Sequence, residues 1–187
     1  MAPNTEVPTD ALARRLAAGD SAAFAELYDH LSQRLYGYFA WVLGSRQDAE
    51  DGLQETFARL VCYRRRLASV EHIDAYAFTV AHSVARQAAR KRDRRRGSER
   101  ELPVDLPAPT QQGALSEEVG RALRALPAEQ REVVVLKVLN GMTAREIAEV
   151  TGRRQSTVES RLAYALEKLR RALAPAFPER TQGKGQE

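Results

Sequence analysis

The stretch from Thr143 to Tyr164 restricts the fold of this chain more than any other, because it predicts two short helices joined by a tight turn. Thr143 followed three residues later by Glu146 is typical of a capping box at the start of a helix. Gly152 can adopt the left-handed backbone that the turn needs without a Cβ penalty. The spacing therefore predicts a helix-turn-helix.

Other residues in this stretch agree with that prediction. The small Ala148 allows the second helix to approach closely, and Val158 is placed to pack back on the first helix. Ser156 or Thr157 is expected to cap the second helix, whose first residues would then face base edges in a major groove. An ordinary helical hairpin would need only the glycine and the capping threonine. The agreement of all these features in one register favours DNA binding.

Composition excludes several classes of protein. The 187 residues are 43% hydrophobic and 29% charged, which suits one large or two small domains that fold in water. No apolar run approaches the roughly 18 residues of a membrane span, and the N-terminus lacks the charge and apolar core of a signal peptide. We therefore expect a cytoplasmic protein without membrane insertion.

Residues that could perform catalysis are not arranged for it. Cys62 is the only cysteine, which rules out an internal disulfide and a cysteine-rich zinc site, and we expect it to be a small buried hydrophobe. The sequence shows no carboxylate cluster with metal spacing, no nucleophile–base pair and no phosphate-cradling GxxxxGK. We expect no catalytic residues, no metal and no cofactor.

The first part of the chain predicts three main helices. Asp10 is expected to cap a short helix over Ala11–Ala18, and Gly19 ends it. Asp20 then starts a longer helix with one apolar stripe. The third helix, DAEDGLQETFARLVCY, follows a start signal at Ser45.

This third helix carries an acidic face. Asp48 and Asp51 lie near the helix N-terminus, where negative charge is favourable. That explanation does not cover Gln54 and Glu55, which lie a turn further on. Together with Asp51 they form an acidic-polar surface suited to a basic partner.

A basic segment follows. Arg64–Glu71 lacks periodicity and is expected to be a loop opened by Arg64, Arg65 and Arg66. A helix then begins at Ile73, and its outer side carries Tyr76, Thr79, Ser83, Arg86 and Arg90. An aromatic residue beside basic ones suits single-stranded or melting DNA, where bases stack and phosphates are neutralised. His82 is expected at the surface.

The end of this helix is a run of positive charge, since Arg86–Arg96 holds seven basic residues against Asp93. Such a run is often a solvated helix end. Because it adjoins aromatic residues and shares a chain with a helix-turn-helix, a nucleic-acid role is favoured.

Residues 97–115 contain three prolines and predict a flexible linker. A second domain is expected from Ser116, with another helix that has Pro127 at its first position. The run VVVLKVL could form a buried strand, but the proline start and Gly141 bracket a segment of helix length, so a helix is expected. The chain is thus predicted to be all-α: a segment 1–19 with a short helix, a domain 20–96, the linker 97–115, a helix-turn-helix domain 116–174 and a disordered tail 175–187.

Three segments together resemble a known family. DAEDGLQETFARL, IDAYAFTVAHSVARQAARKRDRRR and LPAEQREVVVLKVLNGMTAREIAEVTGRRQSTVESRLAYALEKLRRAL are similar to extracytoplasmic-function (ECF) sigma factors of bacterial RNA polymerase. The resemblance covers about residues 20–96 and 116–173. It implies a factor that binds core polymerase, recognises the minus-10 and minus-35 promoter elements and directs transcription initiation.

The resemblance also implies residue roles and partners. The clamp helices of the largest polymerase subunit would bind Asp48, Asp51, Gln54 and Glu55. Minus-10 DNA would contact Arg64, Arg65, Arg66, Tyr76, Thr79, Ser83, Arg86, Arg90 and Lys91. Minus-35 DNA would contact Arg153, Arg154, Ser156, Thr157, Glu159, Ser160 and Arg161. The linker would run past the catalytic centre toward the RNA exit channel, and the flap of the second subunit and an anti-sigma factor are further expected partners.

The chain departs from the family pattern at several positions. Thr79–Ser83 stands where an Arg-Ile-Ala-Arg-Asn-type stretch is common, and Arg153 and Arg154 stand where an Ile-Pro-type pair is usual. Glu159 replaces a common lysine in the recognition helix. It would repel a phosphate but could accept a hydrogen bond from cytosine N4.

Other hypotheses remain. A stand-alone helix-turn-helix regulator that binds operator DNA as a dimer would explain the C-terminal domain but not the Asp48–Glu55 face. A recombinase or nuclease would need catalytic residues that the sequence lacks. A sigma-like protein that chiefly signals through an anti-sigma factor is a third hypothesis, and the residues do not identify its partner.

Overall fold

The computed structural model describes residues 9–95 and 113–175, and every regular element in these two ranges is a helix. This confirms the predicted all-α class. The elements are α1 (Thr9–Ala18), α2 (Ser21–Leu43), α3 (Arg46–Cys62), the 3-10 helix η1 (Arg64–Ser69), α4 (Ile73–Arg95), α5 (Gly113–Arg124), α6 (Ala128–Val134), the π-helical η3 (Val135–Leu139), α7 (Ala144–Thr151) and α8 (Gln155–Leu173). Residues 1–8, most of the predicted linker and nearly all of the predicted disordered tail lie outside the described residues.

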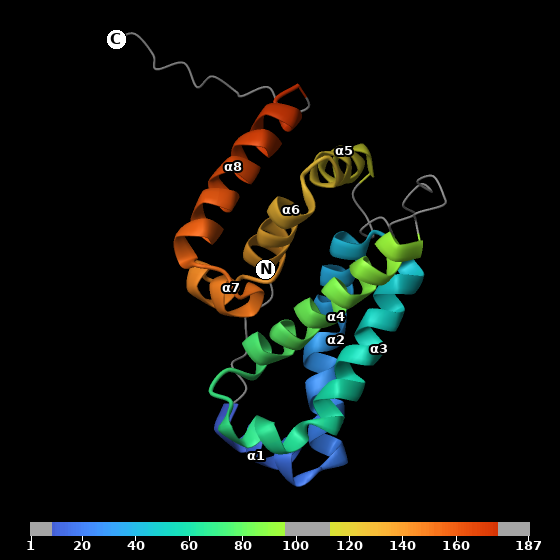
Figure 1. Ribbon diagram of the computed structural model, residues 1–187, viewed down its shortest axis with the longest axis vertical. Coiled ribbons are helices and arrows are strands. Elements are labelled where there is room, and N and C mark those ends of the chain that lie inside the picture. Colours follow the sequence, from blue (N-terminus) through green and yellow to red (C-terminus); the bar gives the residue numbers. More distant parts are fainter. Residues whose placement is uncertain (1–8, 96–112, 176–187) are drawn as a thin grey trace.

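The helices form two units that pack against each other (Figure 1). In the N-terminal unit, α2, α3 and α4 lie side by side, and α1 packs on η1 across one end. In the C-terminal unit, α6 and α8 pack together beside the short α5 and α7. None of the helices in residues 9–95 and 113–175 is both long and apolar enough to cross a membrane.

The core of the N-terminal unit comes from the apolar stripe of α2. Leu27, Leu31, Leu35 and Phe39 are completely buried, as the i, i+4 spacing predicts. Helix α3 approaches α2 closely because it presents Gly52 there: a Cβ at this position would lie 2.7 Å from the Phe39 ring. This contact fixes the position of α3 and of the side chains on its outer face.

Asp20 and Ser45 cap their helices where the sequence predicts helix starts. The carboxylate of Asp20 accepts hydrogen bonds from the backbone N–H groups of Ala22 and Ala23, at 2.9 and 3.3 Å. Ser45 caps α3 by accepting from the N–H of Asp48 at 3.2 Å. Because the helix N-terminus leaves backbone donors unpaired, these side chains define where each helix starts.

The helix-turn-helix is confirmed. Thr143 and Glu146 form the predicted capping box. Gly152 ends α7 with φ +63°, a left-handed conformation that favours glycine. Val158 is completely buried, so the start of α8 is held against the unit's core.

The VVVLKVL run is helical, and its last turn is a π-helix that ends before Gly141, whose φ is +70°. The strand alternative is wrong. Val133, Val134, Val135 and Leu136 are all buried. The run is continuously apolar because other helices surround this segment.

Some predicted boundaries are wrong. Helix α1 begins at Thr9, so Asp10 lies within it, and α5 begins at Gly113 rather than at Ser116. Pro127 precedes the first residue of α6 instead of occupying that position. Helices α1 and α5 begin one to three residues earlier than predicted, because regular backbone bonding extends beyond the residue whose side chain marks the start, whereas α6 begins one residue later.

The predicted loop at Arg64–Glu71 is also wrong, because Arg64–Ser69 forms the 3-10 helix η1. The carbonyl of Tyr63 accepts from the N–H of Arg66 at 2.9 Å, and that of Leu67 from Val70 at 3.1 Å. Leu67 is completely buried and anchors the segment. Six residues are too few for the periodicity that identifies longer helices.

Two predictions about single side chains are wrong. Neither Ser156 nor Thr157 caps α8. The helix begins at Gln155, and its N-cap residue, Arg154, makes no side-chain capping bond. Cys62 is exposed rather than buried, because it is the last residue of α3, where the helix has passed the edge of the core.

Candidate nucleic-acid and protein interfaces

The start of α8 presents a polar surface. Ser156, Glu159 and Ser160 are exposed and Thr157 is half-buried, while Val158 anchors the helix from below. The amide of Gln155 donates to the carboxylate of Glu159 at 2.8 Å. The recognition residues predicted from the sequence therefore lie together on one accessible helical turn.

Two of the arginines expected at this surface have an acidic partner that sequence reasoning missed. Glu129 of α6 pairs with Arg161 and lies 3.7 Å from the guanidinium of Arg153. Arg161 is only 23% exposed, so this pairing restrains it, whereas Arg154 is exposed. No local pattern points to Glu129, because only the packing of α6 on α8 brings it close.

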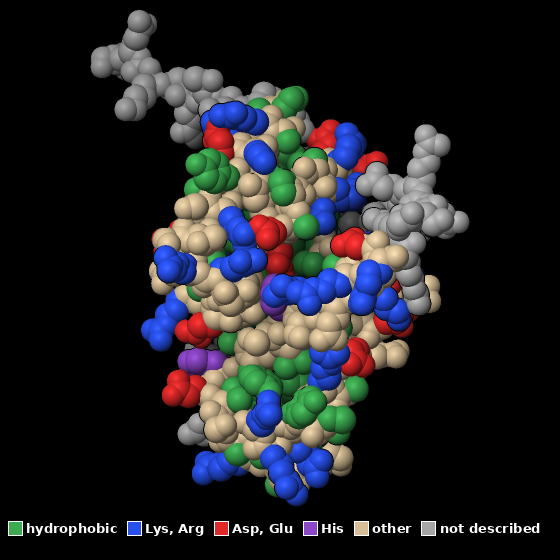
Figure 2. Space-filling view, in the orientation of Figure 1, with side chains coloured by type: hydrophobic (Ala, Val, Ile, Leu, Met, Phe, Trp, Pro, Cys, Tyr) green, Lys and Arg blue, Asp and Glu red, His purple; other side chains and the backbone are tan. Residues whose placement is uncertain are grey.

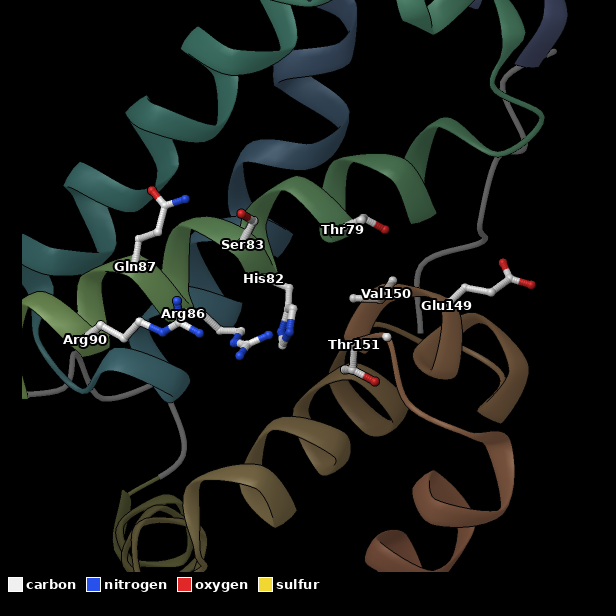
Figure 3. Close-up of a pocket in the computed structure, with 10 residues that line it drawn as sticks. Thr79, His82, Ser83, Arg86, Gln87, Arg90, Glu149, Val150 and Thr151 are labelled. Carbon is white, nitrogen blue, oxygen red and sulfur yellow. The ribbon is translucent and has the colours of Figure 1, made fainter.

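The outer side of α4 gathers most of the predicted strand-binding residues. Thr79, Ser83, Arg86 and Arg90 are exposed and lie along one side of the helix (Figure 3). We call these four residues the α4 basic face. Figure 2 shows Lys and Arg side chains gathered across the middle of the molecule.

The other predicted minus-10 residues lie apart from this face. Tyr76 is partly buried against the core, and Lys91 lines a groove on the side of α4 that meets α3. Arg64 is half-buried beside Gly19, and the guanidinium of Arg66 lies 5.4 Å from the centre of the Tyr63 ring. The structure thus divides the predicted set among three surfaces.

The acidic face of α3 borders that groove. Asp48, Asp51 and Glu55 line it on one side, and Lys91 and Arg92 of α4 line it on the other, around a cavity of about 630 Å³. Gln54 is exposed on the same helix.

Glu55 is part of a chain of hydrogen bonds that links α3 to α4. It accepts a hydrogen bond from Arg59 at 2.7 Å, and Arg59 also donates to Gln87 of α4 at 2.7 Å. The acidic face is therefore held in place by contacts between the two helices.

A carboxylate that is only 15% exposed connects the two units. The carboxylate Oε1 of Glu132 in α6 accepts a hydrogen bond from the phenol of Tyr38 at 2.6 Å and lies 2.7 Å from Nδ1 of His82. The expectation that His82 lies at the surface is wrong: its side chain is 13% exposed, because Glu132 of α6 contacts it and α7 packs against α4.

The charge of Glu132 is stabilised in this position. Burial by itself raises the pKa of Glu132, but the bonds from His82 and Tyr38 and the nearby Arg161 together hold that pKa below its ordinary value. The pKa of Tyr38 is raised well above 10, by burial and by the adjacent Glu132 charge. Glu132 is therefore a carboxylate bonded by two side chains of the other unit.

A helix-turn-helix whose second helix is exposed, together with a basic helical face, is typical of a DNA-binding protein. Residues 27–95 match Sigma-70 region 2, and residues 116–169 match Sigma-70, region 4. The chain is 32% identical to the ECF RNA polymerase sigma factor SigK of Mycobacterium tuberculosis over 183 residues, which cover 91% of this chain and 96% of SigK. The chain belongs to the ECF RNA polymerase sigma factors.

Solved structures agree with this assignment. The sigma factor RpoE from Bartonella quintana, in complex with the anti-sigma factor NepR, shares 25% identity at a TM-score of 0.63, covering 79% of this chain and 96% of that one. CnrH, in complex with the cytosolic domain of CnrY, shares 26% identity at a TM-score of 0.63, covering 90% and 98%. The protein is a non-catalytic transcription initiation factor, whose regions 2 and 4 bind the minus-10 and minus-35 elements.

Proposed function

We propose that α3 docks this sigma factor on the clamp helices of the largest subunit of core RNA polymerase. The residues assigned to this contact are Asp48, Asp51, Gln54 and Glu55. The observation that carries the proposal is the exposed acidic face itself: it lies within the region 2 match, on a helix that packs against both α2 and α4. A concentrated negative surface of this kind suits a basic partner.

We assign the minus-10 contact to the α4 basic face, with Tyr76, Lys91 and the arginines of η1 as further contacts. Opening the duplex costs roughly 1.4 kcal/mol of stacking per base-pair step. A protein surface that neutralises phosphates and holds an unstacked base offsets part of that cost. The exposure and alignment of Thr79, Ser83, Arg86 and Arg90 support this assignment.

We assign minus-35 recognition to the start of α8. The residues expected to face the bases are Ser156, Thr157, Glu159 and Ser160. The residues expected to contact phosphates, or to attract the DNA backbone by their charge, are Arg153, Arg154 and Arg161. Because Glu129 already pairs with two of these arginines, we expect Arg154 to make the strongest phosphate contact. We propose that the domain that binds core polymerase and the minus-10 element comprises residues 20–96, and that the minus-35 domain comprises residues 116–174. The segment between them would pass the catalytic centre of the polymerase.

Two weak DNA contacts become effective when both are mounted on one polymerase, because the second contact is then intramolecular. We place this activity in the cytoplasm, with the polymerase flap as a contact of region 4. We also propose regulation by an anti-sigma factor, since the similar sigma factor RpoE occurs in complex with one.

In vitro transcription tests the proposed function. The purified chain mixed with core polymerase and a genomic promoter library is expected to direct initiation from a discrete set of start sites. Start sites that do not change when the chain is added would contradict it. A specific footprint on operator DNA without polymerase would instead favour the stand-alone regulator.

Glu159→Lys is expected to tighten binding to unrelated DNA and to steepen its salt dependence by about 0.9 in the log–log slope, since one phosphate contact is gained. Glu159 is exposed and bonds only Gln155 among its described neighbours, so the fold should tolerate the change. The binding constant is measured across a series of salt concentrations.

The matched control is Glu117→Lys, which makes the same charge change at an exposed position of α5. Its salt slope should stay at that of the unaltered chain. Equal slopes for both variants would place Glu159 away from the DNA.

A further inference from the structure

The carboxylate of Glu129 in α6 is shared by two arginines of the helix-turn-helix. It pairs with the guanidinium of Arg161 in α8 and lies 3.7 Å from that of Arg153, in the turn before α8. The side chain of Glu129 is 60% exposed and that of Arg153 is 49% exposed. This charged group therefore lies at the surface, where a DNA backbone could reach it.

The position of α8 does not depend on Glu129. Val158 and Ala165 are completely buried, and Ala165 packs with apolar residues of α5 and α6. Lys168 of α8 also donates to Gln130 of α6 at 3.1 Å. Because exposed ion pairs add little to stability, we expect α8 to keep its place when the charge of Glu129 is removed.

The three arginines at this surface are not equivalent. Arg154 is exposed and has no ion pair within the described part of the chain. Arg161 is only 23% exposed and makes the closer contact with Glu129. Arg153 is held more loosely and is half exposed. Arg153 is therefore the arginine that a phosphate could most readily take from Glu129.

A phosphate and the Glu129 carboxylate would use the same donors of an arginine. Sequence-independent DNA binding comes almost entirely from phosphate contacts, so a competing carboxylate acts directly on it. Contacts with base edges fix where a protein lies on its specific site. Without them, the protein can shift until arginines and phosphates meet. Competition by Glu129 therefore weakens sequence-independent binding more than binding to a promoter.

We infer that Glu129 is a specificity-determining residue of the minus-35 surface, because its carboxylate competes with DNA phosphates for Arg153 and Arg161. The inference rests on the proposed minus-35 role of the start of α8. It leaves Arg154 as the main phosphate contact. Selection of a promoter then depends on base contacts and on attachment to polymerase, which makes DNA binding intramolecular.

Glu129→Gln tests the competition, since it removes the charge and keeps the size of the side chain. Binding of the full chain to a duplex of unrelated sequence is measured by fluorescence anisotropy over a series of salt concentrations. The affinity at low salt is expected to rise about threefold to tenfold, and the log–log slope to steepen by about 0.9, as Arg153 gains a phosphate. A purely structural role would instead lower the affinity. An unchanged or shallower slope would overturn the inference.

The matched control is Glu167→Gln, which makes the same charge change in α8. Glu167 also pairs with two arginines, Arg170 at 3.1 Å and Arg171 at 2.7 Å. It lies about 18 Å along the helix from Gln155, away from the predicted DNA surface. Its slope should stay at that of the unaltered chain. Equal steepening in both variants would show a general charge effect and overturn the inference.

Arg153→Ala added to Glu129→Gln identifies the released arginine. The double variant is expected to return to the slope of the unaltered chain. A slope that stays steep would overturn the competition for Arg153. Glu129→Asp, which keeps the charge, should leave the slope unaltered.

Arg154→Ala separates this inference from the proposed minus-35 role. Because Arg154 is exposed and unpaired among the described residues, its loss should make the slope shallower by about 0.9. If the slope does not change, the start of α8 does not face DNA, and the proposed role fails together with the inference. If it becomes shallower while Glu129→Gln has no effect, only the inference fails.

Transcription with competitor DNA measures the consequence for promoter choice. The chain and core polymerase initiate from one promoter of the library while unrelated duplex is added in excess. At equal competitor concentration, Glu129→Gln is expected to lose about threefold more initiation than the unaltered chain, because more of it binds the competitor. Equal losses would overturn the role of Glu129 in specificity.

Discussion

Replacing both Gln54 and Glu55 with lysine is expected to abolish binding to core polymerase while the protein remains folded. The reversal converts part of the acidic face of α3 into a basic one, and like charges across an interface cost several kcal/mol. Both side chains are exposed, and among the described residues the only ion pair lost is the one between Glu55 and Arg59. An exposed pair of this kind contributes about 0–1 kcal/mol, so the stability should change little.

The experiment compares co-purification with core polymerase and the urea unfolding curve. The matched control is Glu26→Lys with Gln33→Lys, which makes the same change in charge at exposed positions of α2. Glu26 likewise loses one exposed ion pair, to Arg15. The control should bind polymerase normally. Normal co-purification of the Gln54 and Glu55 variant would refute the proposed docking face, and loss of binding in both variants would show a nonspecific charge effect.

Gly52→Ala is expected to destabilise the fold by about 1–3 kcal/mol, although alanine is the better helix former. A Cβ at this position would lie 2.7 Å from Cδ1 and 2.8 Å from Cε1 of the Phe39 ring. The ring is completely buried, so it cannot move aside without disturbing α2. The free energy of unfolding in urea measures the effect. Because α3 would shift outward, affinity for polymerase should also fall.

Gly37→Ala is the control for this prediction. Gly37 also lies within a helix, but a Cβ there would meet no atom within 4 Å. Alanine should therefore stabilise the chain by about 0.5–1 kcal/mol through its helix propensity. A double-mutant cycle adds Phe39→Leu to Gly52→Ala, and the pair should cost less than the sum of the two changes. Unaltered stability of Gly52→Ala would show that the contact with Phe39 does not limit the approach of α3.

Some of the candidate sites could be predicted from the sequence because they depend on helical periodicity alone. Thr79, Ser83, Arg86 and Arg90 are spaced by three or four residues, so any helix over this stretch places them on one side. The same argument identified the acidic face of α3. Tyr76 and Lys91 show its limit: a wheel position does not reveal which neighbouring helix covers a side chain.

Contacts between distant residues could not be predicted in this way. His82 follows Thr79 and precedes Arg86 in the sequence, and nothing in that pattern indicates a bond to Glu132, fifty residues later. Likewise, Arg153 and Arg161 look like free phosphate ligands until the packing of α6 on α8 places Glu129 beside them. These pairings depend on the relative position of whole helices.

The long helices, the turn of the helix-turn-helix and the family could be predicted from the sequence, because caps, glycines and apolar spacing act over a few residues. Thr143 with Glu146 and the left-handed Gly152 satisfy backbone groups locally, whatever the rest of the chain does. The contact of the two units through Glu132 could be seen only in the folded structure. That contact depends on burying a shared apolar surface and on pairing a buried charge, and both are properties of surfaces assembled from distant parts of the chain.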